Sequence, residues 1–171
     1  MDGSGLSGAP KRATVIRDFA ESELFDRTFQ EGMTLVEETA AYLDGAGRQD
    51  SKLLSRNAAL AYASESMRLT TRLMQVASWL LVQRAVREGD MAPELACDDN
   101  YRLTNEGPAG RTGAPDGLPS ALVQLLERAE RLYIRVRHLD QRMYIDAGAG
   151  EDTDNPVLAQ MDRLRGAFGA A

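Results

Sequence analysis

The chain has 171 residues and fits one domain with additional flexible segments. Hydrophobic residues make up 43% of it and aromatic residues only 6%, a composition typical of an aliphatic helical core. Its net charge of −6 argues against general binding to nucleic acid or to an anionic membrane, because both interactions need a positive field.

The first predicted helix covers residues 22–43 and follows a flexible head, residues 1–17. The head is rich in Gly and Ser and lacks the apolar stretch of a signal peptide. In the helix, apolar side chains recur every three or four residues and are expected to line one face: Phe25, Phe29, Met33, Val36, Ala40 and Leu43. Gly45 and Gly47 are expected to end the helix.

The second predicted helix, residues 51–88, is long, contains no internal Gly or Pro, and ends at Gly89. An apolar seam repeats every seven residues along it: Leu53, Leu60, Met67, Met74 and Leu81. Small flanking residues would let another helix approach closely. The region around Trp79 is apolar around more of the helix than one neighbour would hide, so we expect a homodimer. The alternative is that the third helix and the following loop complete the cover within one chain.

A long mobile loop, residues 89–118, is expected next, because it contains several Pro and Gly residues and no hydrophobic periodicity. The third predicted helix, residues 119–146, carries the clearest heptad pattern of the chain. We therefore predict an all-α three-helix bundle over residues 18–146, with a long central helix. Residues 147–171 are predicted to form a flexible tail with a short amphipathic segment: Leu158, Met161, Leu164 and Phe168.

A stripe of basic residues follows the third helix at steps of three and four residues: Arg128, Arg131, Arg135, His138 and Arg142. In an acidic protein this stripe is a candidate docking surface for an acidic partner, because Arg is favoured at protein interfaces. The alternative is a solvated face whose arginines pair within the helix or with the acidic first helix. The amphipathic tail segment is a second candidate, expected to engage a partner.

No pattern in the sequence predicts a catalytic, metal or cofactor site. A G-x-G-x-x-G string ends at Gly8, where no strand can precede it as a dinucleotide site requires. The acidic stretch 151–155 lacks the Gly and Glu that a calcium loop needs. The only histidine has Arg135 three residues before it, which does not match a di-iron motif, and the single Cys97 lies in the predicted loop. The longest near-apolar run, residues 76–82, is too short to span a bilayer.

His138 supports an alternative function, because helical bundles that relay phosphoryl groups use one exposed histidine with basic neighbours. Such modules usually place Lys and Gly just after the histidine, so that a receiver domain can approach. Here Leu139, Asp140, Gln141 and Arg142 follow instead. A histidine phosphotransfer module therefore remains the alternative reading, and an ordinary, partly exposed helix histidine is the simplest one.

Three segments together resemble the bacterial regulator of CtrA degradation family: residues 19–25, 67–84 and 132–140. The most specific stretch runs from Ser78 to Arg84, and the resemblance covers about residues 18–144. It implies a dimeric three-helix bundle that acts as a non-enzymatic adaptor for the ClpXP protease in the bacterial cell cycle. By the same implication it would bind the response-regulator-like protein CpdR on ClpX, and would hold cargo or a second adaptor such as PopA. We expect a cytoplasmic protein, and recruitment to a cell pole is a further expectation.

Overall fold

The computed structural model describes residues 8–103 and 114–148, and within these ranges the chain is helical and contains no strand. The all-α prediction is therefore confirmed. The described elements in chain order are α1 (Gly8–Ala20), α2 (Glu23–Asp44), α3 (Ala46–Lys52), α4 (Arg56–Glu88), α5 (Pro93–Ala96), the 3-10 turn η1 (Asp99–Tyr101) and α6 (Ser120–Gly148).

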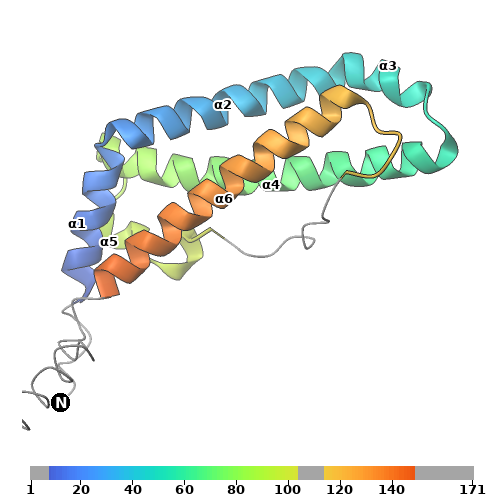
Figure 1. Ribbon diagram of the computed structural model, residues 1–171. Helices are drawn as coiled ribbons and strands as arrows, with labels where there is room; N and C mark the ends of the chain where they lie inside the picture. Colours follow the sequence, from blue (N-terminus) through green and yellow to red (C-terminus); the bar gives the residue numbers. More distant parts are fainter. Residues whose placement is uncertain (1–7, 104–113, 149–171) are drawn as a thin grey trace, which may run out of the picture.

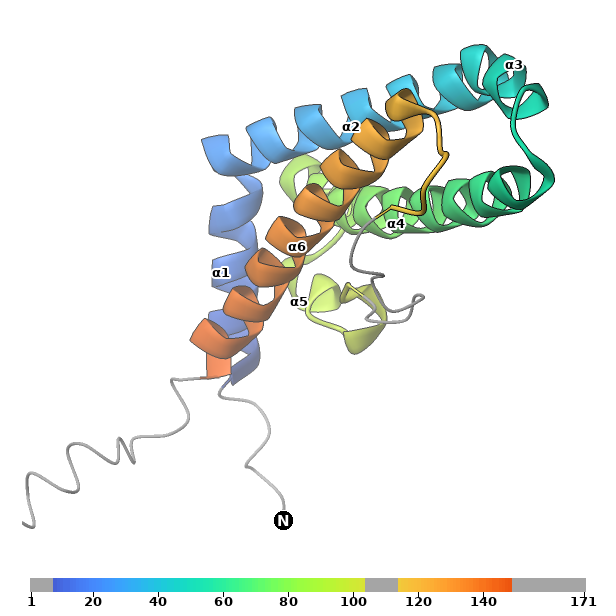
Figure 2. The same cartoon turned by 45° about the vertical axis from the view of Figure 1, so that its right-hand side comes forward.

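The three long helices α2, α4 and α6 form the body of the molecule (Figure 1). The chain passes from α2 through α3 at one end of the molecule and returns along α4. Helix α6 crosses diagonally over both, and α1 stands across the opposite end, where it packs against α6, α5 and α4 (Figures 1 and 2). The predicted bundle is thus present, but a fourth element closes one of its ends.

Local capping chemistry sets where the long helices begin and end. The Ser22 hydroxyl accepts a hydrogen bond from the backbone N–H of Phe25 at 3.2 Å, which starts α2. The Ser55 hydroxyl caps α4 in the same way, by accepting a hydrogen bond from the backbone N–H of Ala58. This helix begins later than the predicted residue 51, because residues 46–52 form the separate helix α3. Helix α4 ends at Gly89, whose φ of 80° suits glycine.

Two segments predicted to be flexible contain helical elements in their described parts. Residues 8–17 of the predicted head belong to α1, where Ala13, Ile16 and Ala20 are buried. The predicted loop 89–118 contains α5 and η1 and buries Leu103. The helices in both segments bury too few apolar residues for a hydrophobic period to stand out in the sequence, and contacts distant in sequence order them. Residues 104–113 of that loop and most of the predicted tail lie outside the described residues.

The core lies between α2, α4 and α6. Its largest fully buried side chains are Leu35, Leu69, Val76, Leu80, Leu122, Leu132 and Val136. Near α1 an aromatic cluster completes it, with the Phe19 ring 5.8 Å from Phe25 and 5.6 Å from Trp79 between centroids. Gly32 allows α2 to approach α4 closely, since a Cβ there would lie 2.6 Å from Leu80 Cδ1. These contacts hold the outer faces of α4 and α6 in place.

Candidate protein-interaction surfaces

The predicted apolar seam of the second helix lies on the surface of the chain. Leu53, Leu60, Met67, Met74 and Leu81 are all exposed, from 51% for Leu81 to 86% for Leu53. Trp79, predicted with them, is instead buried in the core with 3% exposed. The alternative that the third helix and the loop complete the cover within one chain fits the region around Trp79, where Val76, Trp79 and Leu80 are buried, but Leu81 stays exposed. The core side of α4 is a different stripe, containing Leu69, Leu73, Val76 and Leu80.

The exposed side of α4 carries no charge over more than five turns of helix. From residue 57 to residue 78 its exposed side chains are Asn57, Leu60, Ala63, Ser64, Met67, Thr70, Thr71, Met74 and Ser78. We call this set together with Leu81 the α4 face. The hydroxyls of Thr70 and Thr71 each donate to a carbonyl of their own helix at 2.9 Å. These two hydroxyls already have acceptors, so covering them with another protein would cost little polar desolvation.

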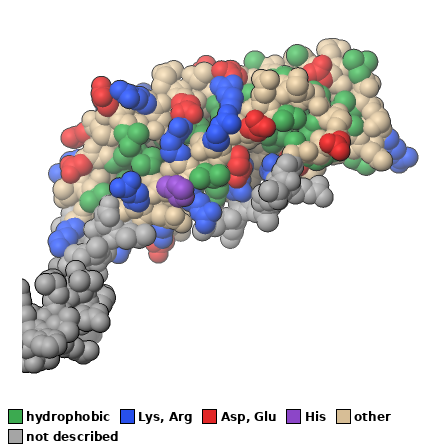
Figure 3. Space-filling view, viewed as in Figure 1, with side chains coloured by type: hydrophobic (Ala, Val, Ile, Leu, Met, Phe, Trp, Pro, Cys, Tyr) green, Lys and Arg blue, Asp and Glu red, His purple; other side chains and the backbone are tan. Residues whose placement is uncertain are grey.

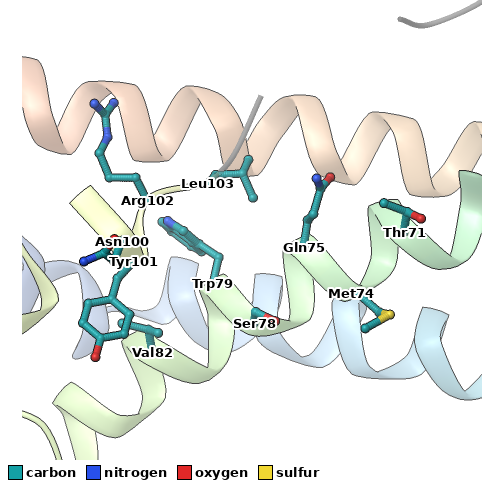
Figure 4. A pocket seen from close by; sticks show the side chains of 10 residues that line it. All are labelled: Thr71, Met74, Gln75, Ser78, Trp79, Val82, Asn100, Tyr101, Arg102 and Leu103. Carbon is teal, nitrogen blue, oxygen red and sulfur yellow. The ribbon is translucent and has the colours of Figure 1, made fainter. Parts of the chain in front are cut away.

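A groove of about 440 Å³ opens next to the α4 face. One wall comes from α4 and the other from residues 100–103, as Figure 4 shows. Its apolar lining comprises Met74, Trp79, Val82, Leu103 and the Tyr101 ring. Met74 and Ser78 belong both to the groove and to the α4 face, so the two features form one continuous surface. Such a surface is suited to a partner that inserts a side chain beside a packed helix.

Asp140 fixes the second wall of this groove. Asp140 is 2% exposed, and its carboxylate accepts hydrogen bonds from the Trp79 indole N–H at 3.0 Å and from the Leu103 backbone N–H at 3.4 Å. The Arg102 guanidinium lies 3.5 Å from its other oxygen. Sequence reasoning did not select Asp140, although a carboxylate between the apolar heptad positions Val136 and Met143 is a signal that could have identified it.

The structure divides the predicted basic stripe of α6 into two groups. Arg128 and Arg135 form ion pairs with Glu38 and Glu31 of α2, and these pairs link the two helices. The Arg128 guanidinium lowers the pKa of the Glu38 carboxyl through a side-chain hydrogen bond. The other three predicted residues, Arg131, His138 and Arg142, are exposed. The solvated-face alternative thus fits Arg128 and Arg135, and a docking role for the other three residues stays a prediction.

Groups that could support chemistry are dispersed in the described part of the chain. Among these residues no group of three or more His, Cys, Asp or Glu could hold a metal ion, and no helix there is long and apolar enough to cross a membrane. Cys97 lies at the end of α5 and donates to the Pro93 carbonyl, whereas His138 is on α6. Burial raises the pKa of the Cys97 thiol, which disfavours the reactive thiolate. The predicted tail residues Leu158, Met161, Leu164 and Phe168 lie outside the described residues.

Comparison with known proteins places most of the chain in one family. A family model described as a protein of unknown function (DUF1465) matches residues 16–168. The crystal structure of RcdA from Caulobacter crescentus CB15 is similar with 70% sequence identity and a TM-score of 0.64, and the match covers 75% of this chain and 98% of that one. No curated protein matches the sequence.

Proposed function

The chain belongs to the DUF1465 family, and we propose that it works as a non-enzymatic adaptor in regulated proteolysis. The family resemblance is confirmed, because RcdA, by its name a regulator of CtrA degradation, is 70% identical. In the proposed mechanism the protein joins ClpXP, primed by CpdR, to cargo or to the second adaptor PopA. Delivery of cargo promotes degradation of cell-cycle regulators such as CtrA in the cytoplasm, with the adaptor recruited to a cell pole.

The observation that carries this proposal is the α4 face. An exposed helix side that combines Leu and Met with small residues and lacks charge is unusual for a solvated surface and typical of the centre of a protein interface. Cationic residues on α6 supply a further surface of different chemistry. An adaptor needs such separate contact surfaces, because its task is to hold two proteins at once.

We assign self-association to the α4 face. Leu60, Met67, Met74 and Leu81 recur every seven residues, the period that keeps two packed helices in contact along their length. Small residues between them, such as Ala63 and Ser78, permit close approach of a second α4. In this arrangement the groove beside Met74 receives a side chain of the second copy, and the α6 surface stays available for other partners.

The tail is proposed to bind cargo or the second adaptor. Its apolar residues Leu158, Met161, Leu164 and Phe168 have the spacing of an amphipathic helix, and nine residues separate them from the last described residue of α6. A tethered apolar segment raises the effective concentration of its binding site near the bundle. Deletion of everything after Asp146 tests this role, and retained delivery of every cargo would refute it.

The proposed function is tested by reconstituted degradation. Purified ClpXP, CpdR and a candidate cargo are combined with and without this protein, and cargo loss is followed over time. We expect faster degradation when the protein is present, and at early times its own amount should not change. Unchanged cargo lifetimes across candidate cargoes, with a folded protein, would exclude the adaptor function.

Exposure of His138 keeps the phosphotransfer alternative testable, because a receiver domain can reach an exposed ring. The full-length protein is incubated with a phosphorylated receiver domain and examined for acid-labile phosphate. A His138→Gln variant serves as the control. Stable phosphate on His138 would favour a relay over an adaptor.

A further inference from the structure

Helix α6 carries exposed basic residues besides the two arginines that form ion pairs with α2. Arg128 and Arg135 are paired with acids of α2. Arg131, Arg137, His138 and Arg142 are exposed, and within the described residues none of them forms an ion pair. Glu127 is four residues before Arg131, yet these two side chains are not paired. Figure 3 shows basic side chains next to the histidine on the face of the molecule that α6 crosses.

Ile134 lies in the middle of this surface with 44% of its area exposed. On a helix, residues three and four positions apart are neighbours, so Arg131, Arg137 and His138 lie next to the Ile134 side chain. The fourth neighbour, Glu130, lies 3.6 Å from Arg72 of α4. Arg142 extends the positive charge by another turn. We call Arg131, Ile134, Arg137, His138 and Arg142 the α6 surface. It combines one apolar anchor with guanidinium groups that could reach carboxylates around it.

We propose that the α6 surface docks an acidic peptide segment of a partner protein that carries a large apolar side chain. The proposal rests on the binding role assigned above and specifies the chemistry of one partner. The apolar side chain covers Ile134, and carboxylates on either side of it meet the guanidinium groups, which bind carboxylates in a bidentate manner. A net charge of −6 on the whole chain favours a local acidic contact here over a nucleic acid, whose long phosphate backbone would meet the acidic remainder.

The surface is also distinct from the α4 face in what it selects. The α4 face has no charge between residues 57 and 78, so it discriminates by shape and apolar contact. The α6 surface would reject a basic segment by like-charge repulsion and would bind a purely polar acidic segment weakly, since Ile134 would stay uncovered. Two surfaces with different requirements allow one adaptor to hold two unlike partners.

Binding of designed peptides to the full-length protein tests the proposal. Three fluorescein-labelled 15-residue probes are used: one of Glu with Leu at every third or fourth position, one with Lys replacing Glu, and one with Ser replacing Leu. We expect the Glu–Leu peptide to bind at least about tenfold more tightly than either of the others in fluorescence polarisation. Backbone NMR shifts on binding should concentrate between residues 127 and 142.

Charge variants locate the site. Arg131→Glu combined with Arg142→Glu should weaken binding of the Glu–Leu peptide at least about tenfold, and Ile134→Ser should weaken its binding several-fold. The matched control is Arg27→Glu with Arg48→Glu, two exposed arginines on α2 and α3, which should retain binding. Circular dichroism verifies that each variant is folded.

Three results would overturn the proposal: equal weakening by the control, peptide-induced shifts centred on α4, or single-stranded RNA binding this surface more tightly than the acidic peptide. The peptide assay contains no ClpXP. A negative result in it would therefore reject the acidic-peptide proposal without deciding the proposed function, which the degradation assay tests separately.

Discussion

The indole N–H of Trp79 donates a hydrogen bond to a carboxylate oxygen of Asp140 at 3.0 Å, and both side chains are buried. This bond joins α4 to α6 across 61 residues of sequence. The same carboxylate holds Leu103 and Arg102, so one buried acid ties together two helices and the segment that forms the groove wall. The groove beside the α4 face therefore depends on a residue that does not line it.

Replacement of Asp140 by Ala should destabilise the protein by about 3 kcal/mol, because the indole and a buried backbone N–H would lose their acceptor. Urea unfolding followed by Trp79 fluorescence measures the change. Asp140→Asn keeps an acceptor oxygen and should cost less. Asp90→Ala, a change at an exposed acid, is the control and should have almost no effect. A stability of Asp140→Ala equal to that of the wild type would contradict the assigned role.

Gly32→Ala should destabilise the protein by about 1–2 kcal/mol, although Ala is the better helix former. The added Cβ would lie 2.6 Å from Cδ1 of the fully buried Leu80 and would force α2 away from α4. Thermal unfolding gives the difference. In a Leu80→Ala background the same change should be neutral or stabilising, because the conflicting atom is gone. A stabilising effect in the wild-type background would show that the close approach is not tight.

Met67→Glu combined with Met74→Glu should convert the proposed dimer to a monomer. Both side chains are more than half exposed within one chain, so folding stability should change by no more than about 0.5 kcal/mol for each change. In the dimer the new carboxylates of the two copies would face each other across a contact that otherwise lacks charge. We expect the dimer dissociation constant to increase at least about a hundredfold. Sedimentation equilibrium measures it. The control Leu95→Glu, at an exposed apolar residue outside the α4 face, should leave association unchanged.

The Cys97 thiol should react slowly with a thiol reagent between pH 7 and 9. Burial and the charge of Glu94 raise its pKa in the folded chain, while Arg12 partly opposes them, so the thiolate is scarce. The pKa of the Cys97 thiol is higher in the folded chain than in the unfolded chain. Its contribution to the free energy of unfolding is therefore fully present below the unfolded pKa and is lost as the pH rises through the folded pKa. Reaction with a disulfide reagent should be at least about tenfold faster in 6 M guanidinium chloride. Equal rates would show that Cys97 is not protected.

The helices that the sequence predicted are those with enough turns to show a hydrophobic period. The structure has α2 over 23–44, α4 over 56–88 and α6 over 120–148, against predictions of 22–43, 51–88 and 119–146. Helix α1 was missed because its buried residues Ala13, Ile16 and Ala20 are too few to stand out from a Gly-rich start. The helical turns in segment 93–103 were missed because this segment also buries too few apolar residues to show a period.

The side of α4 that faces the core could not be predicted from periodicity. The helix has two apolar stripes with helical spacing, one through Leu60, Met67 and Met74 and another through Leu69, Leu73 and Val76. Glu65, Arg72 and Gln83 lie on the buried side and make it look the more polar of the two. The Arg72 guanidinium is buried against the Tyr133 ring, 4.0 Å from its centroid, and lies 3.6 Å from Glu130 of α6. Glu65 pairs with Arg68 at 3.0 Å.

Sequence alone determined the all-helical class, the long α4 and the family, because hydrophobic spacing and a specific residue string are local properties of the chain. Tertiary structure decided which α4 stripe stays uncovered, which α6 arginines are used for ion pairs with α2, and that Asp140 holds the groove wall. Those features arise from contacts between residues about 40 to 100 positions apart, and a spacing rule within one helix contains no information about them.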